Sequence, residues 1–189
     1  MERYAVFFAS MGHATRRSEG GHLRPARLRD VPRLCAILWS ALKEAEVRRI
    51  RMPWEDAGVM SRAIRKGMVT VWQDGARAQG FCIRDGQSLH ALYVSSAMRR
   101  KGVGEHLLKT AQGAARAEGN DLRLYVLAAN RGARAFYARM GFHKVAEGHG
   151  LGNDEGLADW KCAGRGMDTW GRGNRHERDE GRRAGSDPH

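Results

Sequence analysis

Arg99-Arg100-Lys101-Gly102-Val103-Gly104 joins two predicted elements of this 189-residue chain, a strand over Leu89 to Val94 and a helix from Val103 onward. Glycine lets successive backbone N–H groups converge on an anion, and the first turn of a helix adds unpaired donors at the positive end of its dipole. The stretch is therefore a candidate phosphate-binding turn. An exposed turn that simply opens a helix also favours arginine and glycine, so this motif alone leaves both interpretations open.

A second motif follows the strand-like run Leu122 to Leu127 and reads Asn130-Arg-Gly-Ala133-Arg-Ala-Phe136-Tyr137-Ala-Arg-Met-Gly141-Phe142. In chain order, the pattern is strand, R-x-x-G-x-G, helix, strand, N-x-x-A-x-x-F-Y and G-F. This pattern resembles the acetyl-coenzyme A core of the GNAT superfamily of N-acetyltransferases. The resemblance covers roughly Leu23 to Ala163, with both halves in the family's order and spacing.

Hydrophobic periodicity and turn residues predict the other elements. Asp-Gly pairs separate three of the strands and favour tight hairpins, so an antiparallel meander is expected. Asp30 is expected to cap the first helix, with Pro32 in its first turn, and Gly67 to end the second. The predicted strands are 23–28, 68–73, 78–84, 89–94, 122–127, 142–147 and 157–163, and the predicted helices are about 31–48, 53–66, 103–118 and 131–140.

This order, β-α-α-β-β-β-α-β-α-β-β, indicates an α/β fold. The resemblance implies the GNAT-like form, a mixed, mainly antiparallel central sheet flanked by helices. One acetyltransferase domain is expected over residues 23–164. Residues 1–22 are interpreted as a disordered extension, and residues 165–189, rich in glycine, arginine and acidic groups, as a disordered tail.

The net charge is +12, and residues 23–164 carry +10 of it. A basic body suits a ligand with several phosphates, but it suits nucleic acid or an acidic protein equally well. No apolar run approaches the ~20 residues of a membrane span, so no membrane association is expected. Cys35, Cys82 and Cys162 show no metal-ligand spacing and are interpreted as buried apolar side chains, which predicts no metal site and a reducing, cytoplasmic location.

The resemblance implies acetyl-CoA as cosubstrate. In the family the fourth and fifth strands splay apart and admit the pantetheine arm. Here its main-chain contacts belong to Leu92, Tyr93 and Val94, with the Val94 N–H polarising the thioester carbonyl. The pyrophosphate is expected on the N–H groups of Arg99, Arg100, Lys101, Gly102, Val103 and Gly104.

Two residues of the second motif also match family positions. Tyr137 matches the tyrosine that protonates the leaving thiolate in many members, with a packed aromatic as the alternative. Asn130 is expected either to contact the pantetheine or to cap the next helix. These two choices stay open.

The general base is less clear, because no Asp or Glu occurs between Gln87 and Ala97. Ser88 and His90 begin the fourth strand, and neutral His90 could accept a proton near pH 7. A structural histidine is the alternative. Glu44 or Glu46, accepting the proton through a water molecule, are further candidates for the general base. Carboxylates available to hold a cationic amine, beside Trp54 and Trp160, are Glu44, Glu46, Glu55, Asp56, Asp154 and Glu155.

The expected function is acetyl-CoA-dependent transfer of an acetyl group to a primary amine in a small molecule or protein. The alternative is a non-catalytic module of this fold that binds nucleic acid or protein through its basic surface. The intact glycines and Tyr137 favour the enzyme and make nucleic acid the less favoured partner. A longer acyl donor and a homodimer, which many relatives form, stay open.

Overall fold

The computed structural model describes residues 20–44, 53–149 and 158–164. The tail predicted over 165–189, and all but the last residues of the extension predicted over 1–22, lie outside these ranges. The structure confirms the predicted order of elements and adds two short 3₁₀ helices, η1 and η2. In chain order the elements are β1 (His22–Pro25), η1 (Leu28–Asp30), α1 (Val31–Glu44), α2 (Pro53–Arg65), β2 (Val69–Asp74), β3 (Arg77–Asp85), β4 (Ser88–Val94), η2 (Ser96–Met98), α3 (Val103–Ala117), β5 (Leu122–Leu127), α4 (Arg131–Arg139), β6 (His143–His149) and β7 (Ala158–Gly164).

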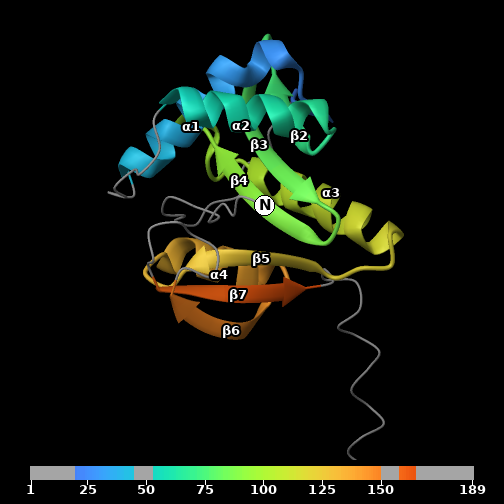
Figure 1. Cartoon of the computed structure of the whole chain (residues 1–189), viewed down its shortest axis with the longest axis vertical. Coiled ribbons are helices and arrows are strands. Elements are labelled where there is room, and N and C mark those ends of the chain that lie inside the picture. The colour runs from blue at the N-terminus through green and yellow to red at the C-terminus, as the bar shows by residue number, and fades with distance from the viewer. Residues whose placement is uncertain (1–19, 45–52, 150–157, 165–189) are drawn as a thin grey trace, which may run out of the picture.

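The strands form one seven-stranded sheet in the order β1-β2-β3-β4-β5-β7-β6 (Figure 1). Each neighbouring pair is antiparallel except β4 and β5, which run parallel. The helix α3 connects these two strands, as a parallel crossover requires. The mixed, mainly antiparallel sheet and its flanking helices confirm the predicted α/β fold class.

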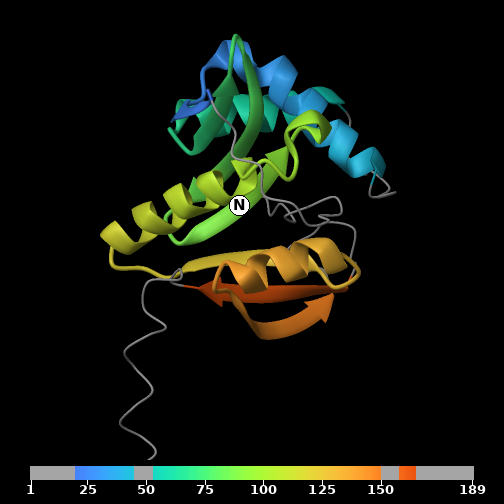
Figure 2. The same ribbon diagram turned by 180° about the vertical axis from the view of Figure 1, so that it is seen from behind.

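Helices cover both faces of the sheet (Figures 1 and 2). The apolar side of α1 packs with α2 on one face, in a core that includes Leu34, Phe81 and Tyr93. On the other face α3 and α4 share a core with Leu92 and Leu107. Successive side chains of a strand point to opposite faces, so β4 contributes to both cores.

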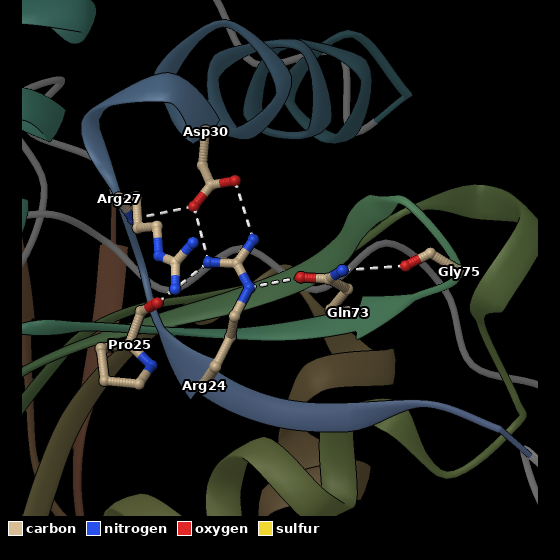
Figure 3. Close-up of polar contacts among 6 residues, drawn as sticks. All are labelled: Arg24, Pro25, Arg27, Asp30, Gln73 and Gly75. Carbon is tan, nitrogen blue, oxygen red and sulfur yellow. Dashed lines mark hydrogen bonds and ion pairs between the residues drawn. The ribbon is translucent and has the colours of Figure 1, made fainter.

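The first strand is shorter than predicted, because the chain turns into η1 at Leu28 instead of extending to it. The carboxylate of Asp30 accepts the Arg27 N–H at 2.8 Å and so closes this turn. It also receives two bonds from the Arg24 guanidinium, at 2.8 and 2.9 Å. Arg24 bonds the side chain of Gln73 on β2 as well (Figure 3). Asp30 therefore connects β1 to η1, and Arg24 in turn connects β1 to β2; a local sequence pattern does not reveal these contacts.

We expect Asp30→Asn to lower the free energy of unfolding at pH 7 by about 2 kcal/mol, because the half-buried guanidinium of Arg24 loses the charged acceptor that buried Asp30 provides. The hydrogen bond from Arg24 lowers the pKa of Asp30 below its ordinary 3.8. A lowered folded-state pKa means that this stabilisation is present at neutral pH and is lost as the pH falls through that range. Urea unfolding at pH 7 and pH 3 measures both effects.

The matched control is Asp85→Asn, which changes an exposed carboxylate at a hairpin turn. Its stability should stay within about 0.5 kcal/mol of the parent protein. Equal stability of Asp30→Asn and Asp85→Asn at pH 7 would contradict the anchoring role of Asp30.

Candidate functional site

The centre of the sheet opens between β4 and β5. In their parallel register, Ser88 pairs with Arg123 and Leu89 pairs with Leu124. Beyond these pairs the two strands diverge towards their C-terminal ends (Figure 2). This divergence agrees with the splayed strands that the resemblance implies, and it leaves Leu92 to Val94 without a β5 partner in register.

The direction of the Val94 N–H follows from its neighbour. Ser95 donates its N–H to the Gln79 carbonyl of β3 at 2.8 Å. Backbone N–H groups alternate in direction along a strand, so the Val94 N–H points away from β3, towards the side from which β5 has diverged. The Val94 carbonyl, which points the same way, accepts a bond from Arg99 Nε at 3.4 Å.

A bulge in β4 places its side chains. The register shifts between Ile83 and Arg84 of β3, so that His90 is the extra residue opposite them. An extra residue reverses the alternation of faces. As a result Leu89 and Leu92 pack on the α3 side, whereas Ala91 and Tyr93 pack on the α1 and α2 side.

The glycine turn has the backbone that an anion site needs. Gly102 has a φ of +81° and is the N-cap of α3, with no side chain capping the helix there. The first N–H groups of a helix have no intrahelical acceptor, so those of Gly102, Val103 and Gly104 point out of the start of α3. Arg100 has a φ of +63°, which also curves the turn. The turn thus presents several donors and the positive end of a 15-residue helix.

The three cations of the turn differ in their contacts. Arg99 is half-buried and ion-paired with Glu44 at the end of α1, a contact that the sequence did not predict. Lys101 Nζ lies 3.8 Å from the sulfur of Met98. Arg100 and Lys101 are exposed at the surface. Arg100 and Lys101 are therefore the cations best placed to meet a phosphate.

The pairing with Arg99 changes what Glu44 can do. The hydrogen bond from Arg99 holds the pKa of Glu44 below its ordinary 4.5. A carboxylate with a lowered pKa is a weak proton acceptor at neutral pH. This argues against Glu44 as a general base. Glu46, the other water-mediated candidate, lies outside the described residues.

Tyr137 lies on α4 and is 1% exposed. Its ring packs edge-on against Phe136 and Phe142, with centroids 5.2 and 5.6 Å away. Burial raises the pKa of its hydroxyl well above 10, with smaller effects from Tyr93, Cys162 and Cys82. The hydroxyl is therefore protonated across the physiological range and can donate a proton, but the same burial also fits a packed aromatic.

Asn130 caps α4, since its side-chain oxygen accepts the Ala133 N–H at 3.0 Å. The capping interpretation of this residue is therefore confirmed.

His90 is half-buried in the bulge. Burial lowers its pKa below 6.5, and nearby Asp85 opposes this effect. The imidazole is therefore mostly neutral at pH 7 and able to accept a proton. Ser88 lies at the start of β4, in register with Asp85 and Arg123.

The carboxylates expected to hold an amine differ in their burial. Asp56 is buried in the first turn of α2, and Glu55 beside it is exposed. Asp154 and Glu155 lie outside the described residues, as does the side chain of Trp54. Trp160 is covered by two cations, Arg134 at 3.8 Å and Lys144 at 4.5 Å from its ring centre. These contacts give Trp160 a packing role between β7, α4 and β6.

The three cysteines are free and buried, as predicted. Burial raises the pKa of Cys82 to about 12 and that of Cys162 to about 11, so neither forms a thiolate nucleophile at neutral pH. Among residues 20–44, 53–149 and 158–164, no three His, Cys, Asp or Glu side chains are grouped to hold a metal ion. None of the helices in the described part of the chain is long and apolar enough to cross a membrane.

Sequence reasoning missed one contact of the turn. His106 Nδ1 lies 3.0 Å from the Gly102 carbonyl, and its ring lies against Trp72 of β2 at 5.0 Å. The spacing of four residues between Gly102 and His106 is the signal that could have indicated it. His106 therefore contacts both the glycine turn and β2 of the sheet.

A family model described as an acetyltransferase (GNAT) domain matches residues 50–153. Solved structures share the fold. Ard1 from Thermoplasma volcanium is 18% identical, with a TM-score of 0.63 over 76% of this chain and 96% of its own. A ribosomal-protein-alanine N-acetyltransferase from Brucella melitensis is 21% identical, with a TM-score of 0.62 over 75% and 98%.

The putative acetyltransferase yncA from Salmonella typhimurium was solved with its cofactor acetyl-CoA. It is 18% identical, with a TM-score of 0.61 over 80% of this chain and 96% of its own. No functionally curated protein matches the sequence.

Proposed function

Because the chain belongs to the GNAT acetyltransferase domain family, we propose that it is an acetyl-CoA-dependent N-acetyltransferase that moves the acetyl group directly to a primary amine. The observation that carries this proposal is the glycine turn at the start of α3, next to the divergence of β4 and β5. The turn offers donors for a diphosphate, and the divergence offers main chain of β4 that has no β5 partner in register, where an extended arm could lie. We also propose that the protein works in the cytoplasm, where its three free cysteines stay reduced.

The turn fits the diphosphate of coenzyme A. The N–H groups of Gly102, Val103 and Gly104 would bind its oxygens, and Arg100 and Lys101 would add charge-assisted contacts. The main chain of Leu92 to Val94 would hold the pantetheine arm. A bound thioester supplies the activated acetyl group, and the protein has to orient it.

The chain offers groups for the developing charges of the reaction. The Val94 N–H, directed away from β3, would donate to the thioester oxygen as negative charge builds there. The Tyr137 hydroxyl, protonated because burial raises its pKa, would give a proton to the departing sulfur. Neutral His90 would accept a proton from the attacking amine, directly or through water.

We expect His90→Gln to remove an acid limb from the pH dependence of kcat/KM. If His90 is the base, activity falls as the pH drops through its lowered pKa, because the imidazole then becomes protonated. Glutamine cannot titrate, so the variant should be slower at pH 8 by roughly tenfold or more and lack this limb. An unchanged profile would assign His90 a structural role.

The proposed function is tested by calorimetry with acetyl-CoA, followed by thiol-release assays with a panel of primary amines. Binding of acetyl-CoA and amine-dependent thiol release are expected. Absence of coenzyme A binding, together with strongly salt-dependent binding to nucleic acid, would favour the non-catalytic module instead. Faster turnover with a longer acyl-CoA than with acetyl-CoA would identify that thioester as the donor, and the reaction would still be acyl transfer to an amine.

A further inference from the structure

One cation of the glycine turn has its partner in a distant part of the fold. Arg99 directly precedes the exposed Arg100 and Lys101, but its own side chain is only 17% exposed. Its guanidinium forms an ion pair with Glu44, the last residue of α1, which lies 55 positions earlier in the chain. The turn opens α3, whereas α1 packs on the opposite face of the sheet. Arg99 therefore links the glycine turn to the helix on the other face.

Both charged groups of this pair have further hydrogen bonds. Glu44 Oε1 accepts a bond from Ser40 Oγ, one helical turn earlier, at 3.0 Å, while Oε2 pairs with Arg99. Arg99 Nε donates to the Val94 carbonyl at 3.4 Å. The N–H donors of a guanidinium lie in a rigid planar fork. Because of this geometry, the bond to Glu44 also fixes the direction from which Arg99 meets Val94.

The end of β4 is held on its other side by β3 and α1. Ser95 donates its N–H to the Gln79 carbonyl and its Oγ to Gln79 Oε1, each at 2.8 Å. The same Oε1 accepts a bond from Arg33 of α1 at 2.9 Å. On the side where β5 has diverged, Arg99 supplies the donor to the Val94 carbonyl. Two links to α1 therefore hold the end of β4, one on each side of the strand.

We propose that Arg99 and Glu44 form a positioning pair that directs the Val94 N–H at the thioester carbonyl, a role that rests on the proposed function and deepens it. The N–H and the carbonyl of one strand residue point to the same side, so a bond that fixes the Val94 carbonyl also fixes its N–H. A donor that is oriented before the reaction stabilises developing negative charge without a cost of reorganisation. Arg99 thus acts through Val94, and the diphosphate is left to the glycine-turn N–H groups with Arg100 and Lys101.

Infrared spectroscopy of bound acetyl-CoA tests this role without an acceptor amine. A hydrogen bond to a carbonyl lowers its stretching frequency, so misdirection of the Val94 N–H should raise the frequency. Acetyl-CoA labelled at the thioester carbonyl should therefore absorb at a higher frequency in Glu44→Gln and in Arg99→Gln than in the parent protein. An unchanged frequency in either variant would overturn the positioning role.

The matched control is Glu118→Gln, which breaks an ion pair of the same kind at the other end of α3. Arg84 of β3 pairs with Glu118 at 2.7 Å, with side chains 21% and 45% exposed, against 17% and 37% for Arg99 and Glu44. Breaking either pair should lower stability to a similar extent, which thermal unfolding measures. Glu118→Gln should nevertheless leave the carbonyl frequency, kcat and the Kd for acetyl-CoA at their parent values.

Kinetics separates positioning from phosphate binding. The acceptor is the primary amine of the panel that the parent enzyme acetylates fastest. Glu44→Gln and Arg99→Gln should each lower kcat roughly tenfold, while the Kd for acetyl-CoA stays within about threefold of the parent value. The double variant should also lose roughly tenfold, because both substitutions break one contact; a loss of ~100-fold would mean that the two residues act independently. A raised Kd in Arg99→Gln with normal behaviour of Glu44→Gln would make Arg99 a phosphate ligand instead.

Failure of the proposed function would give a different result. A parent protein that binds acetyl-CoA but acetylates no amine would overturn the N-acetyltransferase reaction, whereas the carbonyl frequencies would still decide whether the pair directs the Val94 N–H. Absence of acetyl-CoA binding would overturn both proposals. If Arg99→Gln does not fold, the comparison of Glu44→Gln with Glu118→Gln decides the role, because both change exposed carboxylates.

Discussion

Tyr137→Phe is expected to lower kcat by roughly 100-fold or more while leaving the Kd for acetyl-CoA unchanged. The substitution removes a hydroxyl from a ring that is otherwise held by Phe136 and Phe142. If the hydroxyl protonates the leaving sulfur, its loss affects the transition state and not the binding of substrates. Steady-state kinetics together with calorimetry separates the two quantities.

The matched control is Tyr125→Phe, the same chemical change on half-buried Tyr125 of β5, in register with Lys161. Its kcat should stay within about twofold of the parent enzyme, because no proton transfer depends on it. Thermal unfolding of both variants checks that packing is preserved. If Tyr137→Phe retained full turnover, Tyr137 would be a packing residue of the α4 core, and the proton for the sulfur would come from another donor.

Burial of Tyr137 also gives an expectation for pH. The pKa of the hydroxyl is raised well above 10, so the proton donor should stay protonated at alkaline pH. The parent enzyme should therefore show no loss of kcat between pH 8 and about pH 10 from this group.

Gly102→Val is expected to weaken binding of acetyl-CoA roughly 100-fold. Gly102 has a φ of +81°, which a β-branched residue rarely adopts. Valine should therefore shift the turn and redirect the N–H groups that would hold the diphosphate. Loss of two such charge-assisted bonds corresponds to about this change in Kd. Calorimetry with acetyl-CoA measures it.

Gly86→Val is the control for backbone strain alone. Gly86 has a φ of +51° in the turn between β3 and β4, and a Cβ there would meet no described atom within 4 Å. Both variants should lose stability to a similar extent, but only Gly102→Val should lose affinity for acetyl-CoA. Equal Kd values for the two variants would place the diphosphate away from the start of α3 and would overturn the coenzyme site.

Most of the fold could be predicted because its signals are local. Helix periodicity and terminal glycines mark where elements end, as at Gly67, which was expected to end the second helix and follows α2 with a φ of +71°. The main error was the end of β1. Leu28 fits the alternating pattern of a strand. The chain nevertheless turns before Leu28, because the Asp30 carboxylate accepts the Arg27 N–H. Arg24, which lies on β1, holds this carboxylate in place.

The candidate site was predictable only in part. The glycine turn and Asn130 depend on residues close in sequence, and Asn130 caps α4 as one of its two interpretations required. The pairing of Arg99 with Glu44 spans 55 positions, and no periodicity indicates it. Burial likewise distinguishes Asp56 from Glu55, although the two are adjacent in the sequence.

The amino-acid sequence alone specified the kinds of elements, their order and the turn at the start of α3, because each depends on the backbone preferences of neighbouring residues. The tertiary structure decided which charges are paired, which carboxylate is buried and where β4 and β5 separate. These properties depend on which distant elements pack together, since a carboxylate is a solvated charge on one face of a helix, as at Glu55, and a buried hydrogen-bond acceptor on another, as at Asp56.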